Sequence, residues 1–176
     1  DEKLEFFRVP SQVDDDLTVE YAFLPTGGDG SAPHLLLITS GVHGSEAFAG
    51  SAVQIYFLNS IFSKKQLLKT DVLLVHCLNP FGCKYARRAT ENNVNLNRNF
   101  SLTSGLYETK NTNYQKLRTV LEPKGRVLWP LLSRWRLGIL LWWRLKFGGF
   151  TLQELSQGIG QGQFDSPEGV EFGGHQ

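Results

Sequence analysis

Hydrophobic and polar residues alternate in the segment 17–24 (LTVEYAFL), where the apolar side chains occupy every second position. A period of two predicts a strand with one buried face, here formed by Leu17, Val19, Tyr21 and Phe23. The segment 25–33 is a turn cluster rich in glycine and proline. It leads into HLLLITS (34–40), a short continuous apolar run typical of a central strand covered on both faces.

The next two segments predict a strand–helix–strand unit. Residues 46–62 carry apolar side chains at helical spacing, and the small residues 49–52 (AGSA) would let this helix pack close to a sheet. Residues 71–80 form a second apolar run, which ends in Asn-Pro. The order of these elements predicts a right-handed crossover and a parallel strand pair. Ser40 and Leu78 would then lie at the same edge of the sheet, where open α/β folds bind ligands.

The remainder of the chain alternates polar loops with helical segments. Residues 81–101 are predicted to form a long polar loop, and residues 160–174 another. Helices are predicted over 113–122, 127–147 and 151–159. The overall expectation is an α/β fold with a mixed, largely parallel sheet flanked by helices, in a single domain over residues 1–176.

The segment 127–147 is dense in leucine and tryptophan, but it also carries Arg134, Arg136, Arg144 and Lys146. These four charges argue against a membrane span. We interpret the segment as a buried or lid-forming helix, with a helix that binds a partner or a membrane surface as the alternative.

Composition narrows the possible functions. The formal net charge of the 176 residues is +1, so no strong field directs the chain to nucleic acid or to an anionic membrane. Two cysteines, Cys77 and Cys83, are too few for a disulfide framework, and we expect reduced thiols and a cytoplasmic location. The chain contains no methionine and ends just after a glycine pair, which suggests a piece of a longer protein.

His43 and Glu46 lie three positions apart in TSGVHGSEAFAG (39–50), just after a predicted strand. They could be two metal ligands. Alternatively, they could form the polar start of a helix, with Ser45 as its cap and Glu46 at the positive end of the helix dipole.

A second polar motif, RRATENNVNLNRNF (87–100), holds three arginines and five asparagines. Arginine suits bidentate capture of a carboxylate, and asparagine supplies an orienting amide. A metal site and an anion-binding loop at one sheet edge would make a hydrolytic pocket.

Four motifs in order resemble the zinc metallocarboxypeptidases, and more closely a poorly characterised microbial branch of the zinc carboxypeptidase and acylamino-acid deacylase superfamily. They are GVHGSEAFAGSA (41–52, continuing to GSAVQ at 50–54), LNPFGCKYARR (78–88), NVNLNRNF (93–100) and GQFDSPEGVEFGG (162–174). The resemblance implies a carboxypeptidase-like fold, of which this chain would be the N-terminal portion, and Zn as the cofactor.

The resemblance also implies roles for individual residues. His43 and Glu46 match the first two zinc ligands, and Arg88, in preference to Arg87, matches an arginine that polarises the scissile carbonyl. Asn97 and Arg98 match the pair that holds the terminal carboxylate of the substrate. Asn95 stands where the family pattern usually has aspartate, which is expected to shape this loop.

The family pattern further requires a third ligand, a histidine, and a catalytic glutamate, both expected downstream of the glycine pair at 173–174. The histidine is expected in a motif of the form D-x-H-T-G, which this sequence does not contain. His76 is predicted to be a core histidine, His34 to lie at the far edge of the sheet, and His175 to lie in the terminal loop. Glu154, Glu168 and Glu171 are the acids available as a base, and their sequence surroundings support none of them.

The sequence therefore predicts a zinc-dependent hydrolase that cleaves an amide bond next to a free carboxylate, in a small molecule or a peptide. The alternatives are a zinc deacylase of N-acyl amino acids and a non-catalytic remnant. Such a remnant would bind an anionic ligand or a partner protein through the arginine loop and the Trp-rich helix. Binding of nucleic acid through Arg87, Arg88 and Arg98 is disfavoured by the near-neutral charge.

Overall fold

The computed structural model describes residues 4–25, 30, 32–62, 69–102, 105–122 and 129–174. The chain divides into two compact units, residues 1–92 and residues 93–176, and each is described by itself. The expectation of a single domain stays a prediction.

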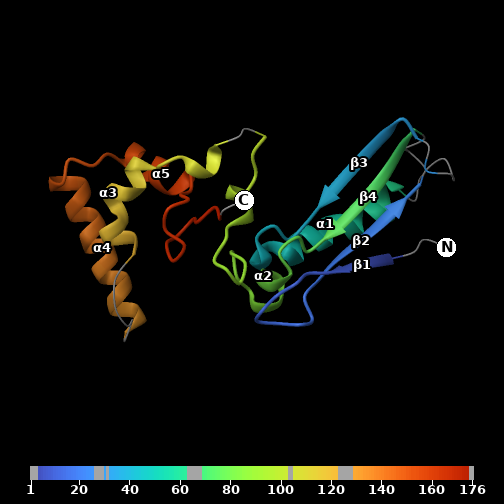
Figure 1. Ribbon diagram of the computed structural model, residues 1–176, viewed down its shortest axis with the longest axis horizontal. Coiled ribbons are helices and arrows are strands. Elements are labelled where there is room, and N and C mark those ends of the chain that lie inside the picture. The colour runs from blue at the N-terminus through green and yellow to red at the C-terminus, as the bar shows by residue number, and fades with distance from the viewer. Residues whose placement is uncertain are drawn as a thin grey trace. The chain divides into compact units, whose positions relative to one another are not determined.

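The first unit contains a four-stranded sheet in the order β1-β2-β4-β3 (Figure 1). Its strands are β1 (Leu4–Arg8), β2 (Thr18–Leu24), β3 (His34–Thr39) and β4 (Thr70–His76). β3 and β4 pair in parallel, as predicted, whereas β2 pairs antiparallel with both β1 and β4. The mixed α/β fold is confirmed, but the sheet is not largely parallel as expected, because two of the three described strand pairings are antiparallel. β1 is a strand that the hydrophobic pattern did not reveal.

α1 (Ala47–Ser60) packs on one face of this sheet and creates the core of the unit. Phe57 of α1 meets Leu24, Val72 and Leu74 of the strands. Of the side chains predicted to be buried here, Leu17 is buried, but the prediction for Phe23 is wrong, because it is 44% exposed and its neighbour Leu24 is buried instead. Side chains alternate between the faces of a strand, so the position of α1 decides which parity becomes the core.

β3 is an edge strand, covered on one face only. Leu36 and Ile38 pack against the core cluster, whereas Leu35 and Leu37 are exposed. The prediction that this continuous apolar run is covered on both faces is therefore wrong for the described structure.

The predicted polar loop after Leu78 begins with a helix, α2 (Pro80–Tyr85). The Asn79 side chain accepts a hydrogen bond from the Gly82 backbone N–H at 2.9 Å, and Pro80 occupies the first turn. Asparagine at the N-cap followed by proline is a strong helix start. The Asn-Pro pair therefore starts a helix as well as ending a strand.

Cys77 and Cys83 form a disulfide, with their Cα atoms 6.4 Å apart. The disulfide links the residue after β4 to α2. The expectation of reduced thiols is wrong for this structure. The expected cytoplasmic location was argued from reduced thiols and therefore loses that support.

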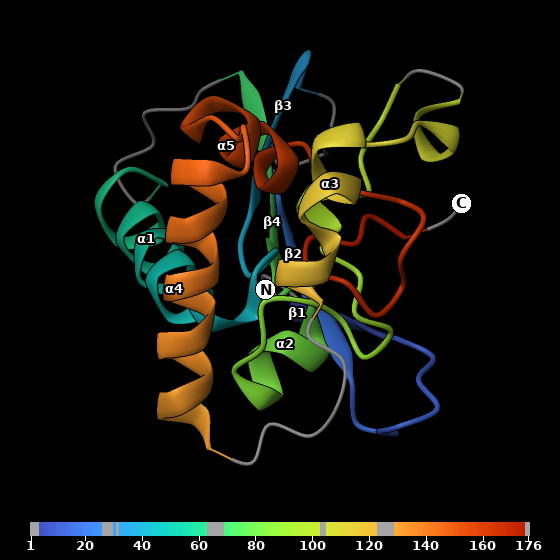
Figure 2. The same ribbon diagram turned by 90° about the vertical axis from the view of Figure 1, so that its left-hand side faces the viewer.

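The second unit is helical and comprises α3 (Thr112–Leu121), α4 (Pro130–Phe147) and α5 (Leu152–Gly160), as predicted (Figures 1 and 2). α3 packs against α5 and buries Tyr114, Leu117 and Val120. α5 begins with a capping box in which Thr151 and Glu154 satisfy each other's backbone N–H groups.

α4 is exposed over most of its surface. None of its residues is buried, so the interpretation as a buried helix is wrong. Large apolar side chains at the surface include Trp135, Ile139, Trp142 and Trp143. Within the described ranges, no helix has the length and apolar character needed to cross a membrane.

Candidate functional site

His43 and Glu46 lie together on a short 3-10 turn, η1 (Gly44–Glu46), between β3 and α1. His43 Nδ1 is 3.3 Å from Glu46 Oε1, and the two side chains are 11% and 68% exposed. Neither η1 nor α1 has a side-chain cap, so Ser45 does not act as predicted in the helix-start interpretation. A nitrogen and a carboxylate oxygen this close together can bind one cation.

Backbone contacts fix η1 at the carboxyl end of the parallel strands. The Leu78 N–H donates to Ser40 O at 3.0 Å, and the Asn79 N–H donates to Gly41 O at 2.9 Å. Gly44 lies against α2, where a Cβ atom would overlap the backbone of Gly82. Only glycine fits at position 44, because η1 and α2 approach so closely there. The hydrogen bond between Leu78 and Ser40 confirms that the ends of β3 and β4 lie at one edge of the sheet.

Gln54 of α1 ties the ends of β3 and β4 to the helix. Its side-chain Nε2 donates to Ile38 O at 3.1 Å and to Val75 O at 3.0 Å. Its Oε1 accepts from Ser40 Oγ at 3.0 Å. This role was not predicted, although a glutamine on the same helix face as Ala47 and Phe57 was a usable signal.

His76 contacts this group, since its Nδ1 lies 2.8 Å from Ser40 Oγ. Its side chain is half-buried, so the interpretation of His76 as a core histidine stays a prediction. His34 is exposed at the start of β3, at the opposite end of that strand from His43, as expected.

Arg88 follows α2 and belongs to the same unit as His43 and Glu46. Asn79 Nδ2 donates to Arg88 O at 3.2 Å, so the residue that caps α2 also holds the backbone at Arg88. The Arg88 side chain is exposed, as is that of Arg87. The structure thus places Arg88 on a turn next to the helix that packs against η1.

Asn97 and Arg98 lie in the second unit, on the 3-10 turn η3 (Leu96–Arg98). Asn95 caps this turn, because its Oδ1 accepts from the Asn97 N–H at 3.0 Å. Asn95 Nδ2 donates to Glu171 Oε2 at 2.5 Å. The amide at position 95 therefore shapes the loop, as the resemblance implied for the residue there, and adds a donor that an ionised aspartate lacks.

Arg98 faces an acidic side chain within its own unit. Its Nε lies 3.7 Å from Glu171 Oε2, and its Nη1 donates to Asn97 O at 3.0 Å. Sequence reasoning considered Glu171 only as a base and missed this ion pair. His43, Glu46 and Arg88 thus share one unit and Asn97 and Arg98 the other, and each group is described within its unit.

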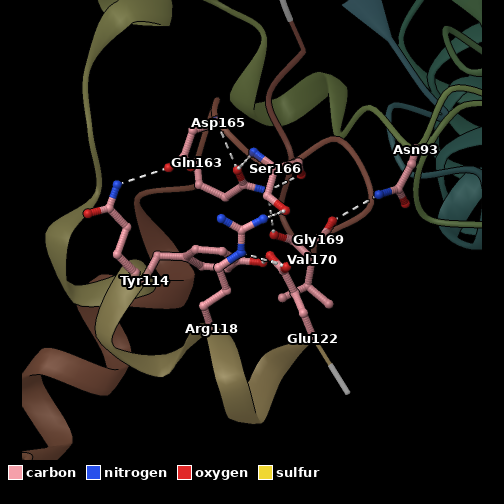
Figure 3. A network of polar contacts seen from close by, with 10 residues as sticks. Asn93, Tyr114, Arg118, Glu122, Gln163, Asp165, Ser166, Gly169 and Val170 are labelled. Atoms are coloured by element: carbon pink, nitrogen blue, oxygen red, sulfur yellow. Dashed lines mark hydrogen bonds and ion pairs between the residues drawn. The ribbon is translucent and has the colours of Figure 1, made fainter. Parts of the chain in front are cut away.

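A network of polar side chains holds the loop that follows α5 (Figure 3). Gln163 is fully buried, and its Nε2 donates to Ser166 O at 2.7 Å. Its Oε1 accepts from the Ser166 N–H, also at 2.7 Å. At the other end of the loop, Asn93 Nδ2 donates to Pro167 O and Gly169 O at 2.8 Å each.

Three side chains of α3 and its C-cap complete this network. Tyr114 donates its hydroxyl proton to Glu122 Oε1 at 2.8 Å, and Arg118 Nε donates to Glu122 Oε2 at 2.8 Å. Burial raises the pKa of Tyr114 well above its usual value. Burial also acts to raise the pKa of Glu122, but hydrogen bonds from Ser166, Arg118 and Tyr114 outweigh it and leave that pKa below its usual value. The network has a structural role, because these side chains hold one another and the loop after α5 in place.

The other two glutamates considered as a general base, Glu154 and Glu168, differ from Glu171 in what surrounds their side chains. Glu154 caps α5 and contacts Lys116 Nζ at 3.4 Å, and Glu168 is exposed on the loop. Among the residues that the structure describes, no three His, Cys, Asp or Glu side chains are grouped to hold a metal. His175 lies outside the described residues.

His43 and Glu46 supply two donors of the types that zinc accepts, and a catalytic zinc site usually has about three protein ligands. The pair thus fits a zinc ion as part of a site.

The chain matches, over residues 2–176, a family described as protein of unknown function (DUF2817). No curated protein matches the sequence.

Proposed function

The chain belongs to the DUF2817 family, and we propose that it is a zinc-dependent hydrolase of the carboxypeptidase type. It would cleave an amide bond next to a free carboxylate in a small molecule or a peptide. The observation that supports this most directly is the convergence of His43 Nδ1 and Glu46 Oε1 at the carboxyl edge of the sheet.

Each site residue has a role in this proposal. His43 and Glu46 hold the metal, which when bound lowers the pKa of a water molecule and polarises the amide carbonyl. Arg88 places a cation beside the developing oxyanion, an effect worth about 3 kcal/mol in transition-state stabilisation for one good donor. Asn97 and Arg98 would bind the carboxylate of the substrate.

The proposal also needs a third ligand and a general base. A histidine and a glutamate are the residue types expected, because neutral imidazole binds zinc and a carboxylate can accept the proton of water. The exposed position of Glu46 leaves room for a further ligand beside it.

A zinc deacylase of N-acyl amino acids would use the same residues. The two activities differ in what leaves the site: an amino acid released from a peptide, or an amino acid released from an acyl group. Comparing N-acyl amino acids with N-acyl dipeptides as substrates separates them.

A binding module is the second candidate function, and the exposure of α4 favours it. This helix carries Arg134, Arg136, Arg144 and Lys146 and no acidic residue. Its exposed tryptophans would provide apolar contact area, and its four cations would favour an acidic partner. This candidate requires no metal, so metal analysis separates it from the hydrolase.

A cytoplasmic location stays a prediction. The Cys77–Cys83 disulfide is more typical of an oxidising compartment, and it should be weighed before any cellular assay is designed.

The proposed activity is tested with the intact protein and a panel of N-acylated amino acids and dipeptides. We expect hydrolysis that a chelator abolishes and added zinc restores. His43→Ala and Glu46→Gln should lose it, whereas His34→Ala, at the opposite end of β3, should retain it. Hydrolysis that is unaffected by chelation, or is equal in wild type and His43→Ala, would contradict the proposal.

A further inference from the structure

The guanidinium of Arg98 is mostly buried beside an acid of its own unit. The Arg98 and Glu171 side chains are 21% and 13% exposed, and Arg98 Nε is buried without a hydrogen-bond partner among the described residues. Glu171 Oε2 lies 3.7 Å from this nitrogen, which is ion-pair distance but too long for a hydrogen bond. The guanidinium is thus charge-compensated, while one of its strong donors is unused.

Arg98 is held in place by its surroundings. Its aliphatic stem packs on Gly162, where a Cβ atom would come within 2.7 Å of Arg98 Cδ. Gly162 also has a φ of +74°, a backbone conformation that favours glycine. Arg98 Nη1 is engaged with Asn97 O. The position of the guanidinium is therefore preset, and any ligand must come to it.

Glu171 is held in place by a different residue. Asn95 Nδ2 donates to Glu171 Oε2, and Glu171 itself adopts a φ of 55°, which is uncommon for a residue with a side chain. Backbone bonds from the Asn95 N–H to Phe172 O and from the Gln163 N–H to Glu171 O fix both sides of this residue. The carboxylate thus lies next to Arg98 and accepts a hydrogen bond from the amide of Asn95.

We propose that Glu171 is an internal carboxylate that competes with anionic ligands for Arg98. This inference rests on the proposed role of Arg98 in binding the carboxylate of the substrate. A carboxylate ligand would form paired hydrogen bonds with the guanidinium, which Glu171 at 3.7 Å does not make through Nε. The ligand must nevertheless displace Glu171 or accept its repulsion, so Glu171 sets how selective Arg98 is for a carboxylate group.

The expected effect follows from mass action. The apparent affinity of a ligand is reduced by the fraction of protein in which its site is open. If Glu171 occupies the site about nine-tenths of the time, its removal should tighten binding of a carboxylate about tenfold.

The test is calorimetric titration of the intact protein with N-acetylglycine in the presence of a chelator, so that any metal site is empty and does not contribute. Glu171→Gln should bind about tenfold more tightly than wild type, because the glutamine Oε1 still accepts from Asn95 but carries no charge. Glu168→Gln removes an exposed carboxylate from the same loop and should bind as wild type does. Adding Arg98→Gln to the Glu171→Gln variant should abolish binding.

Equal affinity of wild type and Glu171→Gln overturns the inference, as does binding that survives Arg98→Gln. Should Glu171→Gln fail to fold, nuclear magnetic resonance of the wild type decides. The Arg98 Nε–H and the Glu171 carboxyl carbon should both shift as N-acetylglycine is added, and a Glu171 signal that stays unchanged overturns the inference. Competition at Arg98 in a protein without zinc-dependent hydrolysis would overturn the proposed function alone.

Discussion

The imidazole of His43 and the carboxylate of Glu46 lie 3.3 Å apart on one 3-10 turn at the end of β3. The turn is fixed from two sides, since the ends of β3 and β4 are joined by backbone hydrogen bonds and Gly44 packs on the backbone of α2. The distance between His43 and Glu46 therefore depends on the contacts that hold this turn at the end of the sheet. Changes at that edge should alter both stability and the proposed metal site.

Gln54 should stabilise this edge more than any exposed residue of α1. Gln54→Leu would remove the donor to Ile38 O and Val75 O and the acceptor of the Ser40 hydroxyl group. We expect the free energy of unfolding to fall by about 1–3 kcal/mol, measured by urea denaturation. The neighbouring Val53→Ala, on the exposed side of the helix, should stay within about 0.5 kcal/mol of wild type. Equal effects would show that the bridge does not stabilise the edge.

Asp14 should make the stability of the first unit sensitive to acid. Hydrogen bonds from Lys84 Nζ and Tyr85 Oη, each 2.7 Å from Asp14 Oδ2, lower the pKa of Asp14 to about 2. Because this folded-state pKa lies below the unfolded value of about 3.9, the charged carboxylate stabilises the fold above about pH 4, and the contribution is lost as the pH falls toward 2.

The sensitivity to acid is measured as the loss of folded protein between about pH 4 and pH 2, followed by circular dichroism. Asp14→Asn should be less stable at neutral pH and should show a smaller loss across this range. The exposed neighbour in Asp15→Asn should leave the profile as in wild type. A profile that Asp14→Asn does not change would rule out this role of the ion pair.

Tyr114 should be a main support of the second unit. Its hydroxyl group is buried and donates to Glu122, so Tyr114→Phe removes a hydrogen bond to a charged acceptor. We expect a loss of about 1.5–3 kcal/mol in the free energy of unfolding, read from chemical denaturation. Tyr56→Phe, at an exposed position of α1, should change little. A Tyr114→Phe variant as stable as wild type would contradict the network in Figure 3.

The disulfide between Cys77 and Cys83 should add to the stability of the first unit. The bond closes a short loop with a sequence separation of 6 residues. Replacing both cysteines by serine should cost about 2 kcal/mol, as expected from the lost constraint on the unfolded chain. Thiol titration of the unfolded protein without reductant should find neither cysteine free. Two titratable thiols would restore the expectation of reduced cysteines.

Much of the fold could be predicted from local patterns. Helical spacing located α1, α3, α4 and α5, and the order of strand, helix and strand indicated the parallel pair of β3 and β4. The same argument placed His43 at the correct edge. These features follow from periodicity and connectivity, both of which are written in consecutive residues.

Other features depend on tertiary contacts that no local pattern encodes. The inward face of β2 is decided by the position of α1, which makes Leu24 a core residue and exposes Phe23. The pairing of Asn95 with Glu171 joins residues 76 positions apart, so their spacing gave no signal. α2 was the exception, because Asn79 and Pro80 are a local helix start that was interpreted only as the end of a strand.

Zinc binding by the intact protein tests the central claim most directly. After dialysis against zinc, metal analysis should find about one zinc ion per chain in wild type and in His34→Ala, and a strong loss in His43→Ala and Glu46→Ala. A protein that retains no zinc under these conditions, or a His43→Ala variant that retains as much as wild type, would contradict the account.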